Sequence, residues 1–370
     1  MAKYDIPFGD LKGQYRKIQP EIDAAIKKVI EASAFIGGPF AREFEESFAD
    51  FCAAEYCVGV GNGTDALFIA LRALGIGPGD EVLVPAMTFV ATGEAVSMAG
   101  AKPVFVDVDP LTGIMSAEDL CKKITPASKA VIAVHLYGCP ADLNSIGKIA
   151  CDNDLFLIQD AAQAHGATFD GKALSAFGDC VCYSFYPGKN LGAYGDAGAI
   201  VTQNTALAEY MRKFANHGRK GKYDHQFEGV NSRLDGIQGA VLSVKLKYLT
   251  QWTADRRAVA EIYKRELSSI EGLTLPNSES RAGHVYHLYV IRCDRRDQLQ
   301  NFLTESGIAT GLHYPVALPF MEAYSSYGHT PDDFPVAYEM QGTILSLPMY
   351  AELGQKKAMQ VCEAVKDSYR

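Results

Sequence analysis

The chain has 370 residues, of which 48% are hydrophobic and 21% are charged, and its formal net charge is −9. This length suits a large domain and a smaller one, and the composition predicts a packed core rather than a disordered chain. The acidic balance argues against an extended nucleic-acid-binding surface. The one basic cluster, residues 219–222, is typical of a solvated loop or, alternatively, of a local patch for an anionic substrate.

Two amphipathic helices are expected near the N-terminus, because apolar residues recur at helical spacing over residues 18–32 and again from Phe40 to Phe51. From about Cys57 to Gln203, short apolar strands alternate with helical segments. The expected strands are 58–60, 81–84, 103–108, 130–134, 155–160, 181–185 and 198–202. Continuous apolar strands that alternate with helices indicate an α/β fold with a mostly parallel sheet sandwiched by helices.

A smaller C-terminal domain is expected after a long connection. Residues 235–270 have a helical pattern with a break near 250–252, and they lead to an alternating strand at 285–293 and a helix near 296–306. We therefore predict a large domain over residues 1–250, including an N-terminal helical arm, and a small α+β domain over residues 251–370.

Nine cysteines are scattered along the chain without tight pairing. Cys180 and Cys182 are two residues apart in an expected strand, so they share one face and suit neither a disulfide nor a zinc site. We expect buried, reduced cysteines and no bound metal.

Residues 1–5 lack the apolar segment of a signal peptide, and no apolar stretch is long enough to cross a membrane. The sequence predicts a cytoplasmic protein without a membrane or nucleic-acid partner.

An acidic residue and a lysine follow two of the expected strands. The apolar run 155–158 leads to Asp160, and the strand 181–185 leads to Lys189. An aspartate in such a place can simply cap a helix, and a lysine in a Gly- and Pro-containing loop is commonly solvated. Together the two groups provide what pyridoxal phosphate needs. A lysine amine forms the imine with its aldehyde, and a carboxylate keeps its ring nitrogen protonated.

A candidate phosphate site, Gly61-Asn62-Gly63-Thr64-Asp65, lies between the strand at 58–60 and a helical run from Asp65 to Leu74. Backbone N–H groups in the first turn of a helix bind phosphate well. The same residues can also form an ordinary N-cap. A dinucleotide-binding loop is not indicated, because the G-x-G-x-x-G spacing is missing.

These residues belong to a longer series of motifs. The series comprises Asn62–Leu67, Gly77–Val82, Thr88–Thr92, Asp160–Gln163, Lys189–Gly192, Gly195–Asp196, His217–Gly218, Asn231–Asp235, His313–Pro315 and Leu347–Met349. With this series the chain resembles the DegT/DnrJ-type nucleotide-sugar aminotransferases over nearly its whole length. The resemblance implies the aspartate aminotransferase fold (fold type I) and dependence on pyridoxal 5′-phosphate. Gly188 and Ala197 depart from the family pattern, and neither replaces a reacting group.

The resemblance also assigns roles at the cofactor. Lys189 would form the imine and move the proton, and Asp160 would pair with the pyridine nitrogen. Phe89 would stack on the cofactor ring, although an aromatic residue at such a position is more often part of the core, and Gln163 would hydrogen-bond the ring hydroxyl. The phosphate would be held by Gly63, Thr64 and Ser184, and Asp65 would also belong to the cofactor-binding residues. His135 also follows a strand, and we interpret it as structural.

Four further positions match family residues at the subunit interface or in the substrate pocket. Asn231 resembles a residue that reaches the cofactor phosphate from the partner subunit, so the resemblance implies a homodimer with shared active sites. Arg233, His313 and Tyr314 match positions that line the sugar-nucleotide pocket. A guanidinium there suits a diphosphate-bearing substrate chemically.

The reaction implied is transfer of an amino group, with glutamate as donor and pyridoxamine phosphate as the intermediate cofactor form, to a nucleotide-linked keto-sugar for amino-sugar and polysaccharide biosynthesis. The run around Ser232 resembles relatives that aminate C3, whereas those that act at C4 more often have Tyr or Phe there. Three alternatives are amination at C4, a sugar dehydratase of the same fold, in which His replaces the lysine, and a regulatory protein. A cysteine desulfurase is disfavoured, because Cys139 is the only cysteine near a strand end.

Overall fold

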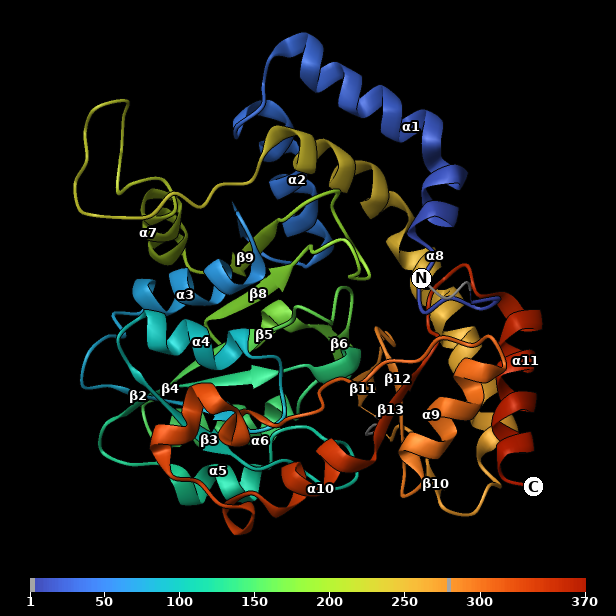
Figure 1. The fold of residues 1–370 in the computed structure, drawn as a ribbon. Helices are drawn as coiled ribbons and strands as arrows, with labels where there is room; N and C mark the ends of the chain where they lie inside the picture. The colour runs from blue at the N-terminus through green and yellow to red at the C-terminus, as the bar shows by residue number, and fades with distance from the viewer. Residues whose placement is uncertain (1–3, 278–280) are drawn as a thin grey trace.

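The computed structural model describes residues 4–277 and 281–370 (Figure 1). Residues 1–3, which belong to the segment searched for a signal peptide, lie outside the described residues. No helix of the described ranges combines the length and the apolar character that a bilayer crossing requires.

The two helices predicted at the N-terminus are present, as α1 (Leu11–Ala32) and α2 (Gly38–Phe51). The apolar side of α1 packs along the long helix α8 (Gly236–Leu267), and this contact buries Ile22 completely. Phe44 and Phe48 of α2 lie edge-on to Phe185, with ring centroids 5.2 Å apart in both pairs. The N-terminal arm is thereby attached to the core just before the loop that carries Lys189.

The central sheet has seven strands in the order β1-β9-β8-β5-β4-β2-β3. Among these strands, β9 alone is reversed: it pairs antiparallel with β1 and β8, and all other pairs are parallel. The predicted mostly parallel sheet is therefore confirmed. The strands are β1 (Tyr56–Val60), β2 (Glu81–Pro85), β3 (Lys102–Val106), β4 (Ser128–Val134), β5 (Phe156–Asp160), β8 (Cys180–Ser184) and β9 (Gly198–Thr202).

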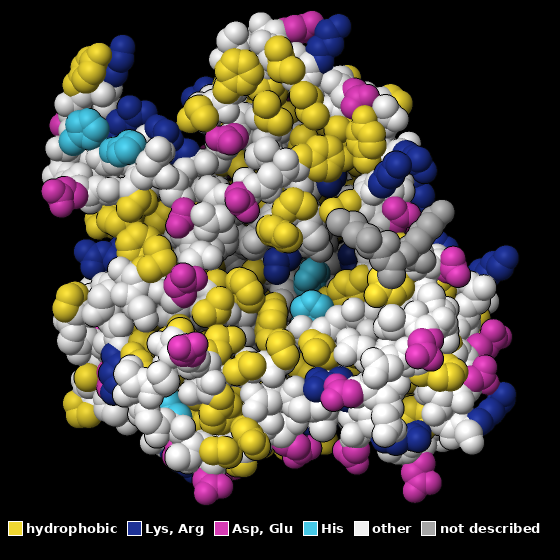
Figure 2. Space-filling view, in the orientation of Figure 1, with side chains coloured by type: hydrophobic (Ala, Val, Ile, Leu, Met, Phe, Trp, Pro, Cys, Tyr) yellow, Lys and Arg dark blue, Asp and Glu magenta, His cyan; other side chains and the backbone are white. Residues whose placement is uncertain are grey.

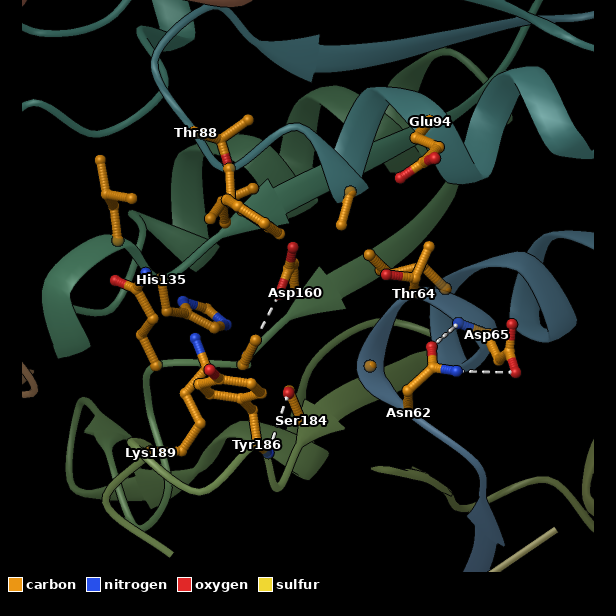
Figure 3. Close-up of a pocket in the computed structure, with 18 of the residues that line it drawn as sticks. Asn62, Thr64, Asp65, Thr88, Glu94, His135, Asp160, Ser184, Tyr186 and Lys189 are labelled. Carbon is orange, nitrogen blue, oxygen red and sulfur yellow. Dashed lines mark hydrogen bonds between the residues drawn. The ribbon is translucent and has the colours of Figure 1, made fainter. Parts of the chain in front are cut away.

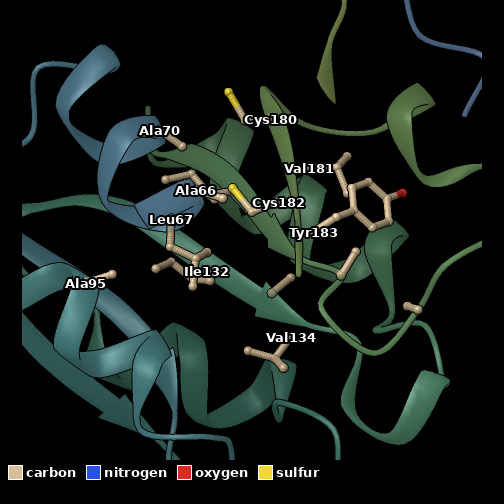
Figure 4. Close-up of a cluster of buried hydrophobic side chains, with 14 of the residues drawn as sticks. Ala66, Leu67, Ala70, Ala95, Ile132, Val134, Cys180, Val181, Cys182 and Tyr183 are labelled. Atoms are coloured by element: carbon tan, nitrogen blue, oxygen red, sulfur yellow. The ribbon is translucent and has the colours of Figure 1, made fainter. Parts of the chain in front are cut away.

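Helices cover both faces of this sheet, with α3 and α4 on one side and α5 and α6 on the other (Figure 1). The helices are α3 (Gly63–Ala73), α4 (Ala91–Met98), α5 (Ala117–Lys123), α6 (Leu143–Asp152) and α7 (Thr205–Phe214). Ala66 and Leu67 of α3 pack towards Ile132 and Cys182 of the sheet (Figure 4). Cys180 and Cys182 are buried and unpaired, as the sequence predicts.

A smaller lobe has its own core around the antiparallel sheet β10-β12-β13. Its elements are the C-terminal half of α8, β10 (Leu273–Thr274), β12 (Tyr289–Cys293), α9 (Arg296–Glu305), β13 (Ile344–Leu347) and α11 (Gly354–Ser368). A third, short sheet of β6 (Thr168–Phe169), β7 (Lys172–Ala173) and β11 (Ala282–Gly283) joins this lobe to the larger one.

The chain passes between the two cores several times. Ile6 is buried in the smaller core, although it precedes the large lobe in sequence. Conversely, Leu318, Tyr324 and Phe334 return to the larger core. This return includes the helix α10 (Pro335–Thr343). Short 3₁₀ turns complete the connections, at Leu136–Gly138, Leu174–Ala176, Leu318–Phe320, Glu322–Tyr327 and Pro331–Asp333. The division of the chain after residue 250 stays a prediction.

Two sequence-based expectations about the connection to the smaller lobe are wrong. No break occurs at 250–252, because α8 continues without interruption from Gly236 to Leu267. Its buried residues change partners there, from the larger core at Leu249 to the smaller core at Val259, which explains the irregular pattern. The strand expected at 285–293 is limited to Tyr289–Cys293, since the preceding residues form the passage between the lobes.

Candidate active site

A cavity of about 530 Å³ lies where the parallel strands end. In Figure 2 a hollow with Lys and His side chains opens between the two lobes. The cavity wall comes mainly from segments that follow β1, β2, β4, β5 and β8, which is where ligands of such sheets bind. The predicted site residues that line it are Gly63, Thr64, Asp65, Phe89, Asp160, Gln163, Ser184, Lys189 and Tyr314.

Asp160 is the last residue of β5 and is only 7% exposed. Its carboxylate accepts hydrogen bonds from the Thr92 hydroxyl at 2.9 Å and from the Ala162 amide at 3.1 Å. Burial raises the pKa of this carboxyl, and the two hydrogen bonds and Lys189 oppose that shift. Within residues 4–277 and 281–370, no cation forms a salt bridge with Asp160. Because a buried charge is costly unless it is paired, this carboxylate is suited to pair with a cationic atom of a ligand.

Lys189 lies in the turn that follows β8, and its side chain enters the same cavity as Asp160 (Figure 3). Burial lowers the pKa of the Lys189 amine, and the charge of Asp160 opposes this shift. A lowered pKa increases the neutral fraction of an amine, and the neutral form is the nucleophile. The pair is therefore suited to covalent chemistry with a carbonyl compound.

The wall beside Asp160 is built by Gln163, Tyr314 and Phe89. The Gln163 amide donates to the Tyr314 hydroxyl at 2.9 Å and accepts from the Tyr137 backbone N–H at 2.6 Å. The rings of Phe89 and Tyr314 lie 5.4 Å apart, and Phe89 is 50% exposed. Half of the Phe89 ring is thus free to contact a planar ligand, which argues against the alternative that it is only a core residue.

The N-terminus of α3 faces the cavity through Gly63 and Thr64. Asn62 caps the helix, with its side chain accepting from the Asp65 amide at 2.8 Å, so the preceding N–H groups stay available. A Cβ on Gly63 would lie 2.6 Å from the Cβ of Ser184, which shows how closely these two segments approach. Backbone donors and the hydroxyls of Thr64 and Ser184 therefore converge on one place that suits a phosphate.

Three predicted site residues do not line this cavity. Asn231 is exposed, and Arg233 donates to the side-chain oxygen of Asn216 at 3.2 Å, in a separate small cavity. His313 lies behind Tyr314, where its ring stacks on Phe8 and is hydrogen-bonded to Ser346. Burial lowers the pKa of His313 to about 4. In a single subunit, Asn231 and Arg233 therefore contribute nothing to the cavity.

Ser232, between these two residues, is buried rather than facing the cavity. It accepts from the Gly61 amide at 2.9 Å and donates to the Asp65 carboxylate at 2.6 Å. The segment 231–233 is thus attached to the N-terminus of α3, although the sequences are far apart.

His135 lines the cavity, but both of its ring nitrogens are engaged. Nδ1 accepts from the Ala141 amide at 2.9 Å, so Nε2 donates to the Gln159 side chain at 3.0 Å. Burial lowers the pKa of His135 to about 4, which keeps the ring neutral. These contacts agree with the structural role expected for it.

Thr92 was not predicted as a site residue, although it lies in the motif Thr88–Thr92. Its contact with Asp160 could not be predicted, because the two residues are far apart in sequence and meet only through the packing of α4 against the sheet. The residues Thr88, Glu94, Tyr186 and Asp196 also line the cavity without having been predicted. Tyr186 and Asp196 could have been found from their positions on either side of Lys189 in the same loop.

Known proteins similar to this chain include one from Saccharopolyspora erythraea described as the erythromycin biosynthesis sensory transduction protein EryC1. It is 44% identical over 98% of this chain and 99% of its own. A dTDP-3-amino-3,4,6-trideoxy-alpha-D-glucose transaminase from Streptomyces venezuelae is 42% identical, over 98% of this chain and 96% of its own. The crystal structure of S. venezuelae DesV in complex with a ketimine intermediate superposes with a TM-score of 0.97. It is 41% identical and covers 99% of both chains.

The model of the DegT/DnrJ/EryC1/StrS aminotransferase family matches residues 16–366. Aminotransferases of this family depend on pyridoxal phosphate. The cavity fits that cofactor, since it combines a buried carboxylate that forms no salt bridge with any described residue, a lysine with a lowered pKa and the backbone donors of a helix N-terminus. By sequence, fold and site, the chain belongs to the DegT/DnrJ/EryC1/StrS aminotransferase family.

Proposed function

We propose that this aminotransferase transfers an amino group from glutamate to C3 of a nucleotide-diphosphate-linked keto-hexose, in the cytoplasm, for amino-sugar and polysaccharide biosynthesis. The observation that carries the proposal is the meeting of Lys189 and Asp160 in one cavity at the carboxyl ends of the strands. When bound there, pyridoxal phosphate supplies an electron-accepting ring.

Lys189 is proposed as the residue that bonds the cofactor and carries the proton at the reacting carbon. Its amine is buried, and burial lowers its pKa, which increases the fraction of the nucleophilic neutral amine. Asp160 is proposed to hold a proton on the ring nitrogen. Thr92 and the Ala162 amide fix both carboxylate oxygens, so the charge is oriented before the ligand arrives.

Gly63, Thr64 and Ser184 are proposed to hold the phosphate, Gln163 to bind the ring hydroxyl, and Phe89 to stack on the ring. Asp65 lies next to these residues in the first turn of α3, but its carboxylate accepts hydrogen bonds from the side chains of Asn62 and Ser232. We therefore assign Asp65 to the support of the helix N-terminus rather than to direct contact with an anion.

The charges of the cavity support a shared site in a homodimer. The lining side chains that ionise as acids are Asp65, Glu94, Asp160 and Asp196, whereas the one cation among the described lining residues is Lys189. The cofactor phosphate and a substrate diphosphate add further negative charge. The cations that neutralise them have to come from outside this cavity.

The partner subunit is the proposed source of these cations. The loop between α7 and α8 projects from the body of the molecule (Figure 1) and carries Arg219, Lys220 and Lys222. Asn231 is exposed at the end of the same loop, where it is free to reach a second copy. Phe35, Ile36 and Tyr223 are 46%, 56% and 83% exposed, and such apolar side chains suit a subunit interface.

Amination at C3 is supported by the S. venezuelae relative, whose name specifies a 3-amino sugar. The presence of Ser232 in place of the Tyr or Phe of relatives that act at C4 gains no support as an argument for C3 within one subunit, because Ser232 is buried against Gly61 and Asp65. His313 and Tyr314 are proposed to contribute to the sugar pocket, Tyr314 directly and His313 by supporting it. Glutamate as donor follows from the family resemblance.

Two other functions within this fold are less well supported. A sugar dehydratase would carry His at the position of Lys189. A purely regulatory role is suggested by the name of the S. erythraea relative, but it would not require the buried pair of Lys189 and Asp160.

The deciding experiment loads the purified protein with pyridoxamine phosphate and offers matched 3-keto and 4-keto sugar nucleotides. Mass spectrometry then identifies the product that gains an amine. Amination of the 3-keto compound alone supports the proposal, and amination at C4 alone overturns the regiochemistry. If neither compound reacts and free keto acids are aminated instead, the proposed substrate class is wrong.

A further inference from the structure

Lys245 of α8 is a buried cation that the proposed reaction does not use. It is 1% exposed, and its ammonium group donates to the Gly192 carbonyl at 2.7 Å. The same group lies 4.3 Å from the centre of the Tyr194 ring. No carboxylate forms a salt bridge with Lys245 within residues 4–277 and 281–370. Its two contacts both belong to the loop that follows Lys189.

This loop connects two residues of the cavity wall, Lys189 and Asp196. It is closely packed at Gly192, where a Cβ would lie 2.2 Å from the Pro187 carbonyl oxygen. A second contact from α8 fixes the loop two helical turns before Lys245, because the Gln238 side chain accepts from the Tyr194 amide at 2.9 Å. One face of α8 thus fixes the far end of the loop from behind the cavity.

The near end of the loop is fixed from the other side. Asn190, which follows Lys189 directly, donates to the Val285 carbonyl at 3.2 Å, and its side-chain oxygen is hydrogen-bonded to His287 at 3.1 Å. Among these anchors Lys245 alone carries a charge. Burial lowers the pKa of Lys245 to about 8, and the charge of Glu352 opposes this shift. Burying an ammonium group without a carboxylate partner is costly, so a hydrophobic residue would be easier to accommodate for stability alone.

We propose that Lys245 is a positioning residue of the transamination reaction, which holds the loop 189–196 so that the Lys189 amine stays aligned in the cavity. The inference rests on the role proposed for Lys189. The Lys245 ammonium touches neither the substrate nor the cofactor site, and it acts through the Gly192 carbonyl and the Tyr194 ring. A misplacement of about 1 Å in a reacting group can lower turnover by about a hundredfold, so this anchor affects catalysis from a distance.

The test compares Lys245→Met and Lys245→Arg with the matched control Lys247→Met, which alters an exposed lysine on the same helix. In Lys245→Met, loss of the donor to Gly192 and relief of the buried charge act in opposite directions on stability. We therefore expect a melting temperature close to that of the wild type at pH 7 and full formation of the borohydride-reducible cofactor adduct. We expect kcat to fall by about ten- to a hundredfold, with KM for the sugar nucleotide within about twofold.

Arginine retains the charge and a donor, so Lys245→Arg is expected to recover most of kcat, and Lys247→Met to behave as wild type. The inference is overturned if Lys245→Met keeps the wild-type kcat. It is also overturned if the loss of kcat accompanies a loss of folded protein and Lys245→Arg fails to restore turnover. Lys189→Ala, measured in parallel, separates the two proposals. A reducible adduct that persists in Lys189→Ala contradicts the role of Lys189 and with it this inference, whereas a wild-type kcat in Lys245→Met overturns the role of Lys245 alone.

Discussion

The Thr92 hydroxyl donates a hydrogen bond to the Asp160 carboxylate at 2.9 Å, and Thr88 lies 3.0 Å from the same Thr92 oxygen. This contact joins the N-terminal turn of α4 to the end of β5. Because hydrogen bonds to the charged form favour ionisation, Thr92 opposes the effect of burial on the pKa of Asp160. Thr92 therefore favours the charged form of this buried carboxylate.

Replacing Thr92 by Val should raise the pKa of Asp160 further. The Asp160 carboxylate should then interact more weakly with the protonated ring nitrogen of pyridoxal phosphate. A hydrogen bond to a charged group contributes about 1.5–3 kcal/mol, so we expect kcat to fall by about ten- to a hundredfold. Steady-state kinetics at saturating cofactor measures this. Thr88→Val, which removes the contact of Thr88 with Thr92 and leaves both hydrogen-bond donors to Asp160 in place, should have a smaller effect. Equal kinetics for Thr92→Val and the wild type would contradict the assignment.

Asp160→Asn should bind the cofactor and lose most turnover, since a neutral amide cannot keep the ring nitrogen protonated. On the order of 3 kcal/mol of the barrier is at stake, which is more than a hundredfold in rate. The measurement is the single-turnover rate with saturating cofactor, with cofactor content determined in the same sample. Turnover near that of the wild type would show that Asp160 has no such role.

Lys189→Ala should fold. It should lose the covalent imine between the lysine and the cofactor, and with it the visible absorbance of that imine. The reason is that Lys189 is the one lysine among the described residues that line the cavity. Borohydride reduction followed by peptide mass spectrometry locates any adduct. An adduct on another residue of the variant would show that Lys189 was assigned wrongly.

A mixed dimer tests the shared site. One subunit carries Lys189→Ala and the other carries Asn231→Ala with Arg233→Ala, so that only one of the two sites receives an intact set of residues. We expect neither homodimer to be active and the heterodimer to recover about half of the wild-type activity per dimer. Heterodimers that form but show no recovery would contradict sharing of the site between subunits.

Lys245 should make stability depend on pH. Its pKa of about 8 in the folded protein lies below its ordinary value of 10.5, so folding disfavours its charged form. The cost is fully present below pH 8, and it disappears as the pH rises through 10.5. The free energy of unfolding of the wild type relative to Lys245→Met should therefore rise over this interval, by up to about 3 kcal/mol. Urea titrations at several pH values measure it, and a constant difference would contradict the low pKa.

The sheet was predictable from the sequence, because its strands are apolar throughout and each ends near a turn signal. For the same reason Thr64, Phe89, Asp160 and Lys189 could be expected at one edge of the sheet. Contacts that depend on packing between distant elements were not predictable. Thr92 with Asp160 and Ser232 with Asp65 are both of this kind, since no periodicity links their positions.

The resemblance to a family placed Arg233 and His313 among substrate-binding residues, but one subunit keeps both out of the cavity. Arg233 contacts Asn216, and His313 lies behind Tyr314. The spacing of residues along the sequence does not by itself tell which subunit's site a residue serves. The continuous α8 was missed because its buried side chains pass from one core to another, which disturbs the pattern of a single amphipathic face.

The repeated passages of the chain between the two cores restrict how far the two lobes can move relative to each other. The β6–β11 pairing and the return of Leu318 to the larger core tie the lobes together. Such cross-links oppose a hinge that swings open. Donor and sugar nucleotide would therefore enter and leave in turn through a mouth of constant width, and the free and liganded enzyme should give nearly identical small-angle scattering curves.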